Sequence, residues 1–160
     1  MNTDSVFSRA ALTVGMRLFG LFKMPIIAFI SPRLIELSDE SVVIRIPLVH
    51  RTKNHLRTMH LGVLASAADF TVGVLVMGAI KKSGAKVSMV FKSFHADFKK
   101  RVDGNAHFKC NQGRQIAQLI AEAVNTGERQ ELPVNVEVTV PAKSDEVAAN
   151  FSLILSVKRK

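Results

Sequence analysis

Six segments of the chain show the two-residue alternation or the short apolar run that is typical of β-strands. The longest of them changes its apolar parity near Ser93, which predicts a β-bulge there. A turn of the Asp-Gly type at Val102–Asn105 then predicts a hairpin between this strand and the next. The predicted strands are Leu34–Leu37, Ser41–Leu48, Ala85–Phe98, Ala106–Cys110, Val134–Val140 and Ala149–Val157.

Two segments carry the 3.6-residue period of an amphipathic helix. The first is predicted from Ser5 to Phe22, and Pro25 breaks helical structure shortly after it. The second is predicted from Ile116 to Val124, where Gly127 supplies the stop signal.

The run Leu61–Ile80 is apolar along its whole length and long enough to cross a bilayer. Asp69 is its one charged residue and falls almost at the centre, where a lipid-facing carboxylate would cost about 2.5–3.5 kcal/mol. Amphipathic strands are predicted on both sides of the run. A helix that is apolar all round also occurs where a sheet wraps around it. We therefore predict a buried central helix and no transmembrane segment.

The order of these elements predicts an α+β fold, in which an antiparallel sheet curls around the central helix. Residues 1–30 are expected to form an N-terminal amphipathic helical segment, and residues 31–160 a single domain with one further helix. Arg9 and Arg17 interrupt the first segment, so it lacks the continuous apolar stretch of a signal peptide. It is expected to pack on the domain or on a partner subunit, and peripheral membrane contact stays open.

Composition narrows the class of protein. Of 160 residues, 48% are apolar and 22% charged, which excludes intrinsic disorder. The single cysteine, Cys110, excludes a disulfide framework and fits a reducing compartment, so a cytoplasmic location is expected. The five histidines are scattered without carboxylate or cysteine partners at ligand spacing, and no metal site is expected.

The net charge of +9 is concentrated, because residues 81–101 hold seven basic residues against Asp97. Such a segment is either a solvated strand with its turns or a local anion site. Charge confined to so short a stretch suits one ligand better than a long duplex, and the chain lacks Trp and Tyr. We expect no nucleic-acid partner. The basic residues most relevant to an anion are Lys81, Lys82, Lys99, Lys100 and Arg101.

The junction before the central helix carries the candidate chemistry. Thr58 is predicted as the N-cap, which leaves the backbone amides near His60, Leu61 and Gly62 without partners in the helix. Such amides, at the positive end of the helix dipole, can hold an anion or a developing oxyanion. A lone histidine such as His60 also fits an ordinary capping or surface role.

Asp69 is the second candidate, because a carboxylate inside an apolar run is expensive to bury unless it is functional or specifically paired. His60 and Asp69 are nine residues apart, and at about 100° per residue this is about 900°, half a turn from a common face. One subunit does not bring them together, whereas two copies related by a twofold axis can. We therefore expect a homodimer with two identical sites, and whether dimers pair into tetramers stays open.

The spacing of Asn54, His60, Gly62 and Asp69 resembles that of the hotdog-fold acyl-CoA thioesterases, most closely the phenylacetate-degradation-type branch and its relatives. The resemblance covers roughly residues 30–158 and is sharpest over residues 51–77. Where the family often has two glycines after the histidine, this chain has Leu61 in the first place. The resemblance implies a hotdog fold and the hydrolysis of acyl thioesters, as in fatty acid metabolism.

The resemblance also implies roles for individual residues. Asn54 would bind the thioester carbonyl or the attacking water, and the Leu61 and Gly62 amides would polarise the carbonyl. Asp69 of the partner chain would act as general base, oriented by Ser88 or, in reserve, Ser93. The basic residues Lys81, Lys82, Lys99, Lys100 and Arg101 would meet the phosphates of coenzyme A or the acidic surface of an acyl carrier protein. Coenzyme A is then part of the substrate, and no separate cofactor is expected.

Two other functions stay open. One is a non-catalytic acyl-CoA-binding protein of the same fold. The other is a hydratase or dehydratase of acyl thioesters, in which His55, fourteen residues before Asp69, would pair with that carboxylate. The proline-rich approach to the helix found in hotdog dehydratases is absent from this chain.

Overall fold

The computed structural model describes residues 3–160, and side chains from residue 8 onward. Its elements are α1 (Thr3–Lys23), α2 (Pro25–Ile30), β1 (Arg33–Leu37), β2 (Val42–Ile46), the 3-10 helix η1 (His50–Thr52), α3 (Leu61–Ser83), β3 (Val87–Phe98), β4 (Ala106–Cys110), α4 (Gly113–Thr126), β5 (Gln130–Val140) and β6 (Ser144–Arg159). All neighbouring strands are antiparallel, in the order β1-β2-β4-β5-β6-β3. The predicted α+β fold is confirmed.

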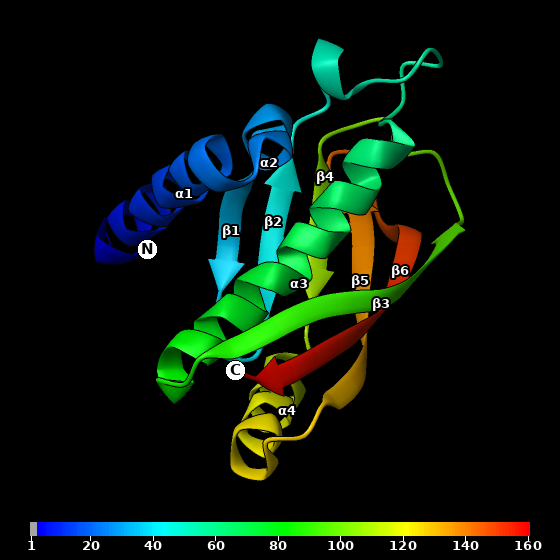
Figure 1. Ribbon diagram of the computed structural model, residues 1–160. Coiled ribbons are helices and arrows are strands. Elements are labelled where there is room, and N and C mark those ends of the chain that lie inside the picture. The colour runs from blue at the N-terminus through cyan, green and yellow to red at the C-terminus, as the bar shows by residue number, and fades with distance from the viewer. Residues whose placement is uncertain (1–2) are drawn as a thin grey trace.

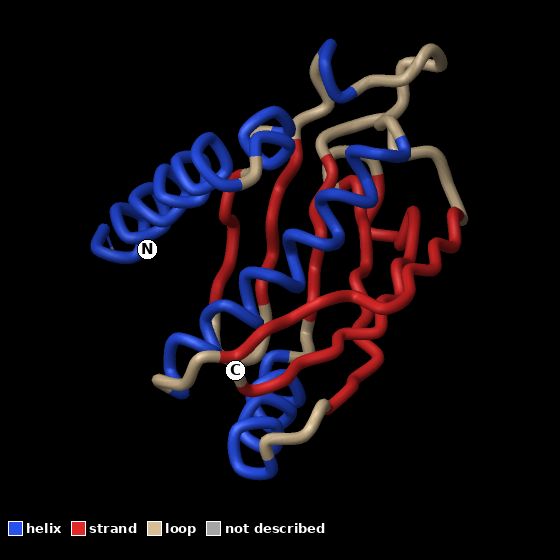
Figure 2. Tube along the Cα trace, in the orientation of Figure 1, coloured by secondary structure: helices blue, strands red, loops and turns tan. Residues whose placement is uncertain are grey.

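The sheet curls around α3, which crosses its concave face (Figure 1). In the tube view the strands β2, β4 and β5 lie behind this one long helix, and β3 runs along its lower side (Figure 2). Val72 and Val76 of α3 lie in the same buried core as Phe108 and Phe151 of the sheet. Among the described residues, α3 alone is long and apolar enough to span a membrane, and half of its most apolar window is buried inside the domain. The burial identifies it as the predicted central helix.

The structure confirms the bulge in β3 but not the predicted hairpin. The pairing of β3 with β6 shifts register between Phe91 and Phe94, close to Ser93. The prediction that Ala106–Cys110 pairs back on the preceding strand is wrong, because β4 lies between β2 and β5. The alternating residues of β4 that face the core pair with apolar residues of those two strands. The segment with the Asp-Gly turn therefore connects the edge strand β3 to β4 in the middle of the sheet.

The N-terminal segment is two helices. The predicted break is confirmed, since α1 ends at Lys23 and Pro25 occupies the first turn of α2, where its missing N–H costs nothing. The two helices meet at Gly20, where a β-carbon would lie 2.7 Å from the Ala28 backbone nitrogen. Several apolar side chains of this segment stay exposed, so its contact with a partner subunit or a membrane surface remains a prediction. They are Leu18, Leu21, Phe22, Ile26 and Phe29.

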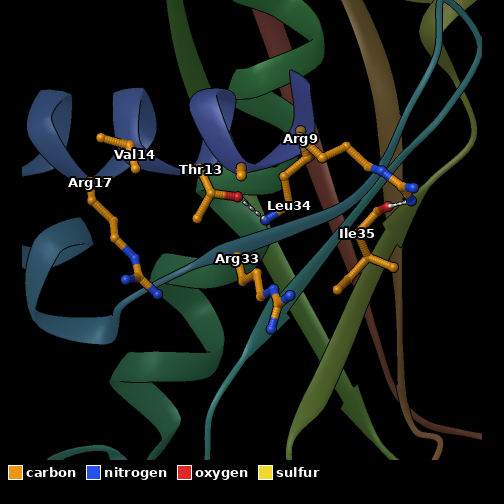
Figure 3. A pocket seen from close by; sticks show the side chains of 8 residues that line it. Arg9, Thr13, Val14, Arg17, Arg33, Leu34 and Ile35 are labelled. Atoms are coloured by element: carbon orange, nitrogen blue, oxygen red, sulfur yellow. Dashed lines mark hydrogen bonds between the residues drawn. The ribbon is translucent and has the colours of Figure 1, made fainter. Parts of the chain in front are cut away.

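Helix α1 covers the outer edge of β1 through polar side chains (Figure 3). The Thr13 hydroxyl accepts a hydrogen bond from the Leu34 amide at 3.2 Å, and Arg9 donates to the Ile35 carbonyl at 3.1 Å. Arg17 donates to the Pro32 carbonyl at 3.3 Å. Backbone groups that β1 cannot pair with a strand are thus paired with a helix.

Candidate functional site

Asn54 shapes the loop that leads into α3. Its side-chain oxygen accepts from the backbone amides of Leu56 and Thr58, at 2.9 and 3.1 Å. Its side-chain nitrogen donates to the Thr58 hydroxyl at 2.9 Å. These bonds close a turn in which Arg57 has a φ of +62°. The whole Asn54 side chain is therefore engaged inside the loop, and its contact with a thioester remains a prediction.

The N-cap of α3 is His60, so the prediction of Thr58 is wrong. The Thr58 hydroxyl is held by Asn54, and the bridge between Lys53 and Met59 keeps this stretch extended up to the helix. His60 donates its backbone amide to the Thr52 carbonyl at 2.9 Å. Its Nδ1 accepts from the Gly62 amide at 3.0 Å.

These caps decide which amides at the helix start remain open. The amides of His60 and Gly62 are occupied, whereas that of Leu61 has no acceptor among residues 3–160. Leu61 and Gly62 are both exposed. The positive end of the helix therefore presents one open N–H group, and a second becomes available when the His60 ring turns away.

Asp69 lies half-buried on the face of α3 that turns towards α1. Its carboxylate has no hydrogen-bond or ion-pair partner in the described part of the chain. Burial raises the pKa of this carboxyl above its ordinary value. Asp69 follows Leu61 by eight residues, or about 12 Å along the helix axis. One protomer therefore does not bring the open amide and the carboxylate to one reacting centre.

An apolar groove of about 610 Å³ runs between α1 and α3 and contains Asp69. Its walls come from the two helices, with Met24 and Met89 at its borders. The sequence predicts that α1 packs on the domain or on a partner subunit, but it does not predict that α1 lines one groove with Asp69. The signal in the sequence is weak: Gly15 of α1 and Gly73 of α3 both line the groove, and a β-carbon at either position would meet no atom within 4 Å.

The serine candidates do not approach Asp69 within this protomer. Ser88 donates its hydroxyl to the Lys158 carbonyl at 3.1 Å, on the neighbouring strand. Because Met89 faces the groove and successive strand residues point to opposite faces, Ser88 points away from it. Ser93 is exposed at the bulge.

The predicted basic residues fall into two groups at opposite ends of α3. Lys81 borders the groove and Lys82 forms an ion pair with Asp39. Lys99, Lys100 and Arg101 are exposed. They lie near the helix start, since the carbonyl of the adjoining Val102 accepts a hydrogen bond from the Met59 amide. Lys100 forms an ion pair with Glu146. Twenty residues of helix, about 30 Å, separate Leu61 from Lys81, so the two groups do not bind one phosphate.

His55 belongs to the exposed loop that projects beyond the start of α3 (Figure 1). The structure does not pair it with Asp69 in one protomer, since the carboxylate lies further along the helix. Among residues 8–160, whose side chains are described, no three His, Cys, Asp or Glu side chains gather as metal ligands.

A curled antiparallel sheet around one long helix defines the class of this protein as the hotdog fold, and solved structures share it. A protein of unknown function from Chlorobaculum tepidum is similar with a TM-score of 0.80 and 13% identity, over 95% of this chain and 97% of that one. A probable thioesterase from Pseudomonas aeruginosa has a TM-score of 0.70 and 22% identity, over 92% and 96%. A thioesterase from Haemophilus influenzae has a TM-score of 0.63 and 14% identity, over 89% and 88%.

Residues 15–155 match the family described as "Domain of unknown function (DUF4442)", and the chain belongs to that family. No curated protein matches the sequence.

Proposed function

We propose that this protein hydrolyses acyl thioesters, with Asp69 activating the attacking water. The observation that carries the proposal is a half-buried carboxylate without a partner among the described residues, in an apolar groove of about 610 Å³. A raised pKa brings such a group closer to the range in which it exchanges protons with water efficiently. The structural similarity to proteins called thioesterases supports the same reaction. The phenylacetate-degradation-type branch stays a prediction from the sequence.

The site that we propose needs two protomers. A carbonyl held at the Leu61 amide and a water held at Asp69 must lie about 3–3.5 Å apart to react, but these groups are about 12 Å apart along one helix. A second copy can supply the missing group. The outer edge of β3 supports such pairing, because it is twelve residues long, has no strand partner among residues 3–160 and exposes Val90, Phe94 and Phe98.

In the proposed reaction, the thioester carbonyl oxygen accepts a hydrogen bond from the Leu61 amide of one protomer. It accepts a second one from the Gly62 amide once the His60 ring has turned away. Asp69 of the second protomer takes a proton from water as the water oxygen attacks the carbonyl carbon. The tetrahedral oxyanion forms against the amides and then collapses. The carbon–sulfur bond breaks and the carboxylic acid leaves. The thiolate takes up the proton that Asp69 removed from water.

The thiol carrier is proposed to be coenzyme A or an acyl carrier protein. The pantetheine arm separates the thioester from the phosphates of either carrier. We propose that Lys99 and Arg101, which are exposed on the segment next to the helix start, meet these phosphates when the thioester carbonyl lies at Leu61. Lys81 and Lys82, at the far end of α3, fall outside this arrangement.

One observation favours a second candidate, an acyl-CoA-binding protein without hydrolysis. The His60 Nδ1 occupies the Gly62 amide at 3.0 Å, which is the position of an oxyanion in the hydrolytic proposal. If the ring stays there, a thioester can bind without being attacked.

A thiol-trapping assay with a panel of acyl-CoA esters separates the two candidates. We expect thiol release by the wild-type protein and its loss in Asp69→Asn. Binding of acyl-CoA by calorimetry without thiol release by the wild-type protein would instead select the binding function.

A further inference from the structure

The groove between α1 and α3 is long, and all but two of its lining residues are apolar. Along α3 its wall consists of residues spaced by three or four positions, from Asp69 through Gly73 and Met77 to Lys81. Twelve residues of helix give this wall a length of about 18 Å. Asp69 and Lys81 are the ionisable side chains of the lining, and they stand at its two ends. Everything between them is apolar.

The lining is rich in methionine. Four of the six methionines of the chain border the groove: Met16, Met24, Met77 and Met89. Methionine side chains are unbranched and flexible, so a surface made of them adapts to apolar ligands of different shape and length. The volume of about 610 Å³ lies within the range of small-molecule sites, about 300–1,000 Å³.

We propose that this groove holds an unbranched aliphatic acyl chain, with its thioester end at Asp69 and its tail directed along α3 towards Lys81. The inference rests on the proposed function and deepens it, because it names the class of acyl group. An aromatic acyl group would fill only the end near Asp69 and leave the remaining length empty. A polar or charged acyl group would find no partner along the apolar middle of the lining.

The two glycines that face the groove give the sharpest test. A β-carbon added at Gly73 of α3 or at Gly15 of α1 meets no atom within 4 Å, so a larger residue enters the groove rather than the core. Gly78 has the same free space on α3 but does not line the groove. Gly73→Leu and Gly15→Leu therefore block the groove from its two walls, and Gly78→Leu is the matched control. All three exchanges raise helix propensity, so thermal unfolding should show folded proteins.

The first measurement is kcat/KM for butyryl-, octanoyl- and lauroyl-CoA. We expect it to rise in the wild-type protein by up to about fourfold per methylene that enters the groove. The ratio of lauroyl-CoA to butyryl-CoA should fall about 10–100-fold in Gly73→Leu and in Gly15→Leu. It should stay within about twofold of wild type in Gly78→Leu. Unchanged ratios in both groove variants, or a wild-type preference for phenylacetyl-CoA over lauroyl-CoA, would overturn the inference.

The second measurement does not depend on turnover. Cis-parinaric acid, a fluorescent unbranched fatty acid, should bind the wild-type protein and the Gly78→Leu variant, and bind both groove variants at least about tenfold more weakly. If this pattern appears without hydrolysis of any acyl-CoA, the proposed function fails while the acyl groove stands. Hydrolysis with equal parinaric acid affinity in all four proteins overturns the groove and leaves the proposed function intact.

Discussion

The two outer strands of the sheet differ in whether their outer edges are covered. Strand β1 is five residues long, and side chains of α1 bind its backbone groups at Leu34 and Ile35 and the carbonyl of Pro32 just before it. Strand β3 is twelve residues long, and its outer edge is uncovered in the described part of the chain. Long uncovered edges invite pairing with another chain, and proteins usually shorten or cover them. The difference indicates that one edge is closed and the other is available to a second copy.

In the proposed dimer, this asymmetry has a functional purpose. An open β3 edge lets two protomers join, and joining brings Asp69 of one protomer to the helix start of the other. The covered β1 edge then prevents further addition of strands. If the two edges respond alike to substitution, or if hydrolysis does not depend on the open edge, the two edges do not have different roles.

The largest expected effect concerns the carboxylate itself. Asp69→Asn keeps the size of the side chain and removes the base, so kcat should fall by about 10²–10⁴. Binding of a non-hydrolysable acyl-CoA analogue should change little, and calorimetry measures it on the same sample. An unchanged kcat would remove Asp69 from the reaction.

The pH dependence of stability tests the same residue by a different property. Burial raises the pKa of Asp69, so the folded protein holds this proton more tightly than the unfolded chain. The resulting stabilisation is complete below the pKa of the unfolded chain and is lost as the pH rises through the raised folded pKa. Asp69→Asn should therefore melt at a higher temperature than wild type at neutral pH, and the difference should shrink in acid. A difference independent of pH would contradict this account.

A mixed dimer tests whether the open edge completes the site. Leu61→Pro removes the open amide at the first position of α3, where proline is well tolerated, and kcat should fall by about 10²–10³. A dimer purified with two tags, one chain Asp69→Asn and the other Leu61→Pro, would contain one intact site of two. It should recover about half of wild-type kcat, although each homodimer is inactive. A mixed dimer as inactive as its parents would show that the site is not shared.

Matched lysine substitutions compare the two edges directly. Val90 on β3 is 52% exposed and Leu37 on β1 is 44% exposed. Val90→Lys places like charges near the twofold axis of the proposed dimer and should weaken association about tenfold, as measured by analytical ultracentrifugation. Leu37→Lys should leave association unchanged. Equal effects of both substitutions would erase the distinction between the edges.

The smallest expected effect concerns the closed edge. Thr13→Val keeps the shape of the side chain but removes the acceptor of the Leu34 amide, at a cost of about 1 kcal/mol. The melting temperature should fall by about 2–4 °C. Val14→Thr, the reverse exchange at the neighbouring exposed position, should leave it unchanged. No shift in Thr13→Val would mean that water replaces the hydroxyl without loss.

Local patterns predicted the elements better than their partners. Alternation located the strands, and the apolar run with its central Asp69 predicted the core helix, because these signals depend on which side of an element is buried. The hairpin at Asp103-Gly104 was wrong, because a turn signal does not reveal which strands a curled sheet places side by side. The N-cap is His60 and not the predicted Thr58, because Asn54 binds the threonine hydroxyl across a loop.

The site was predictable only in part for the same reason. Asp69 is conspicuous in the sequence, since it is the one charge in its segment. The groove that contains it is lined by α1 and α3. Nearly forty residues separate the end of α1 at Lys23 from the start of α3 at Leu61, and nothing in either helix alone indicates that both line one groove. Whether Ser88 faces Asp69 of its own protomer depends on which alternate residues of β3 face the groove, and Met89 is the one that does so.

The glycine at which the first two helices meet allows their close approach. Gly20 lets the backbone of Ala28 come so close that a β-carbon would stand 2.7 Å from its nitrogen. Any other residue there would clash with that backbone, so α1 and α2 would have to move apart. Gly15 and Phe19 of α1 border the groove, so a shift of α1 would change the width of the groove. The width of the groove beside Asp69 therefore depends on Gly20, a position that does not line the groove.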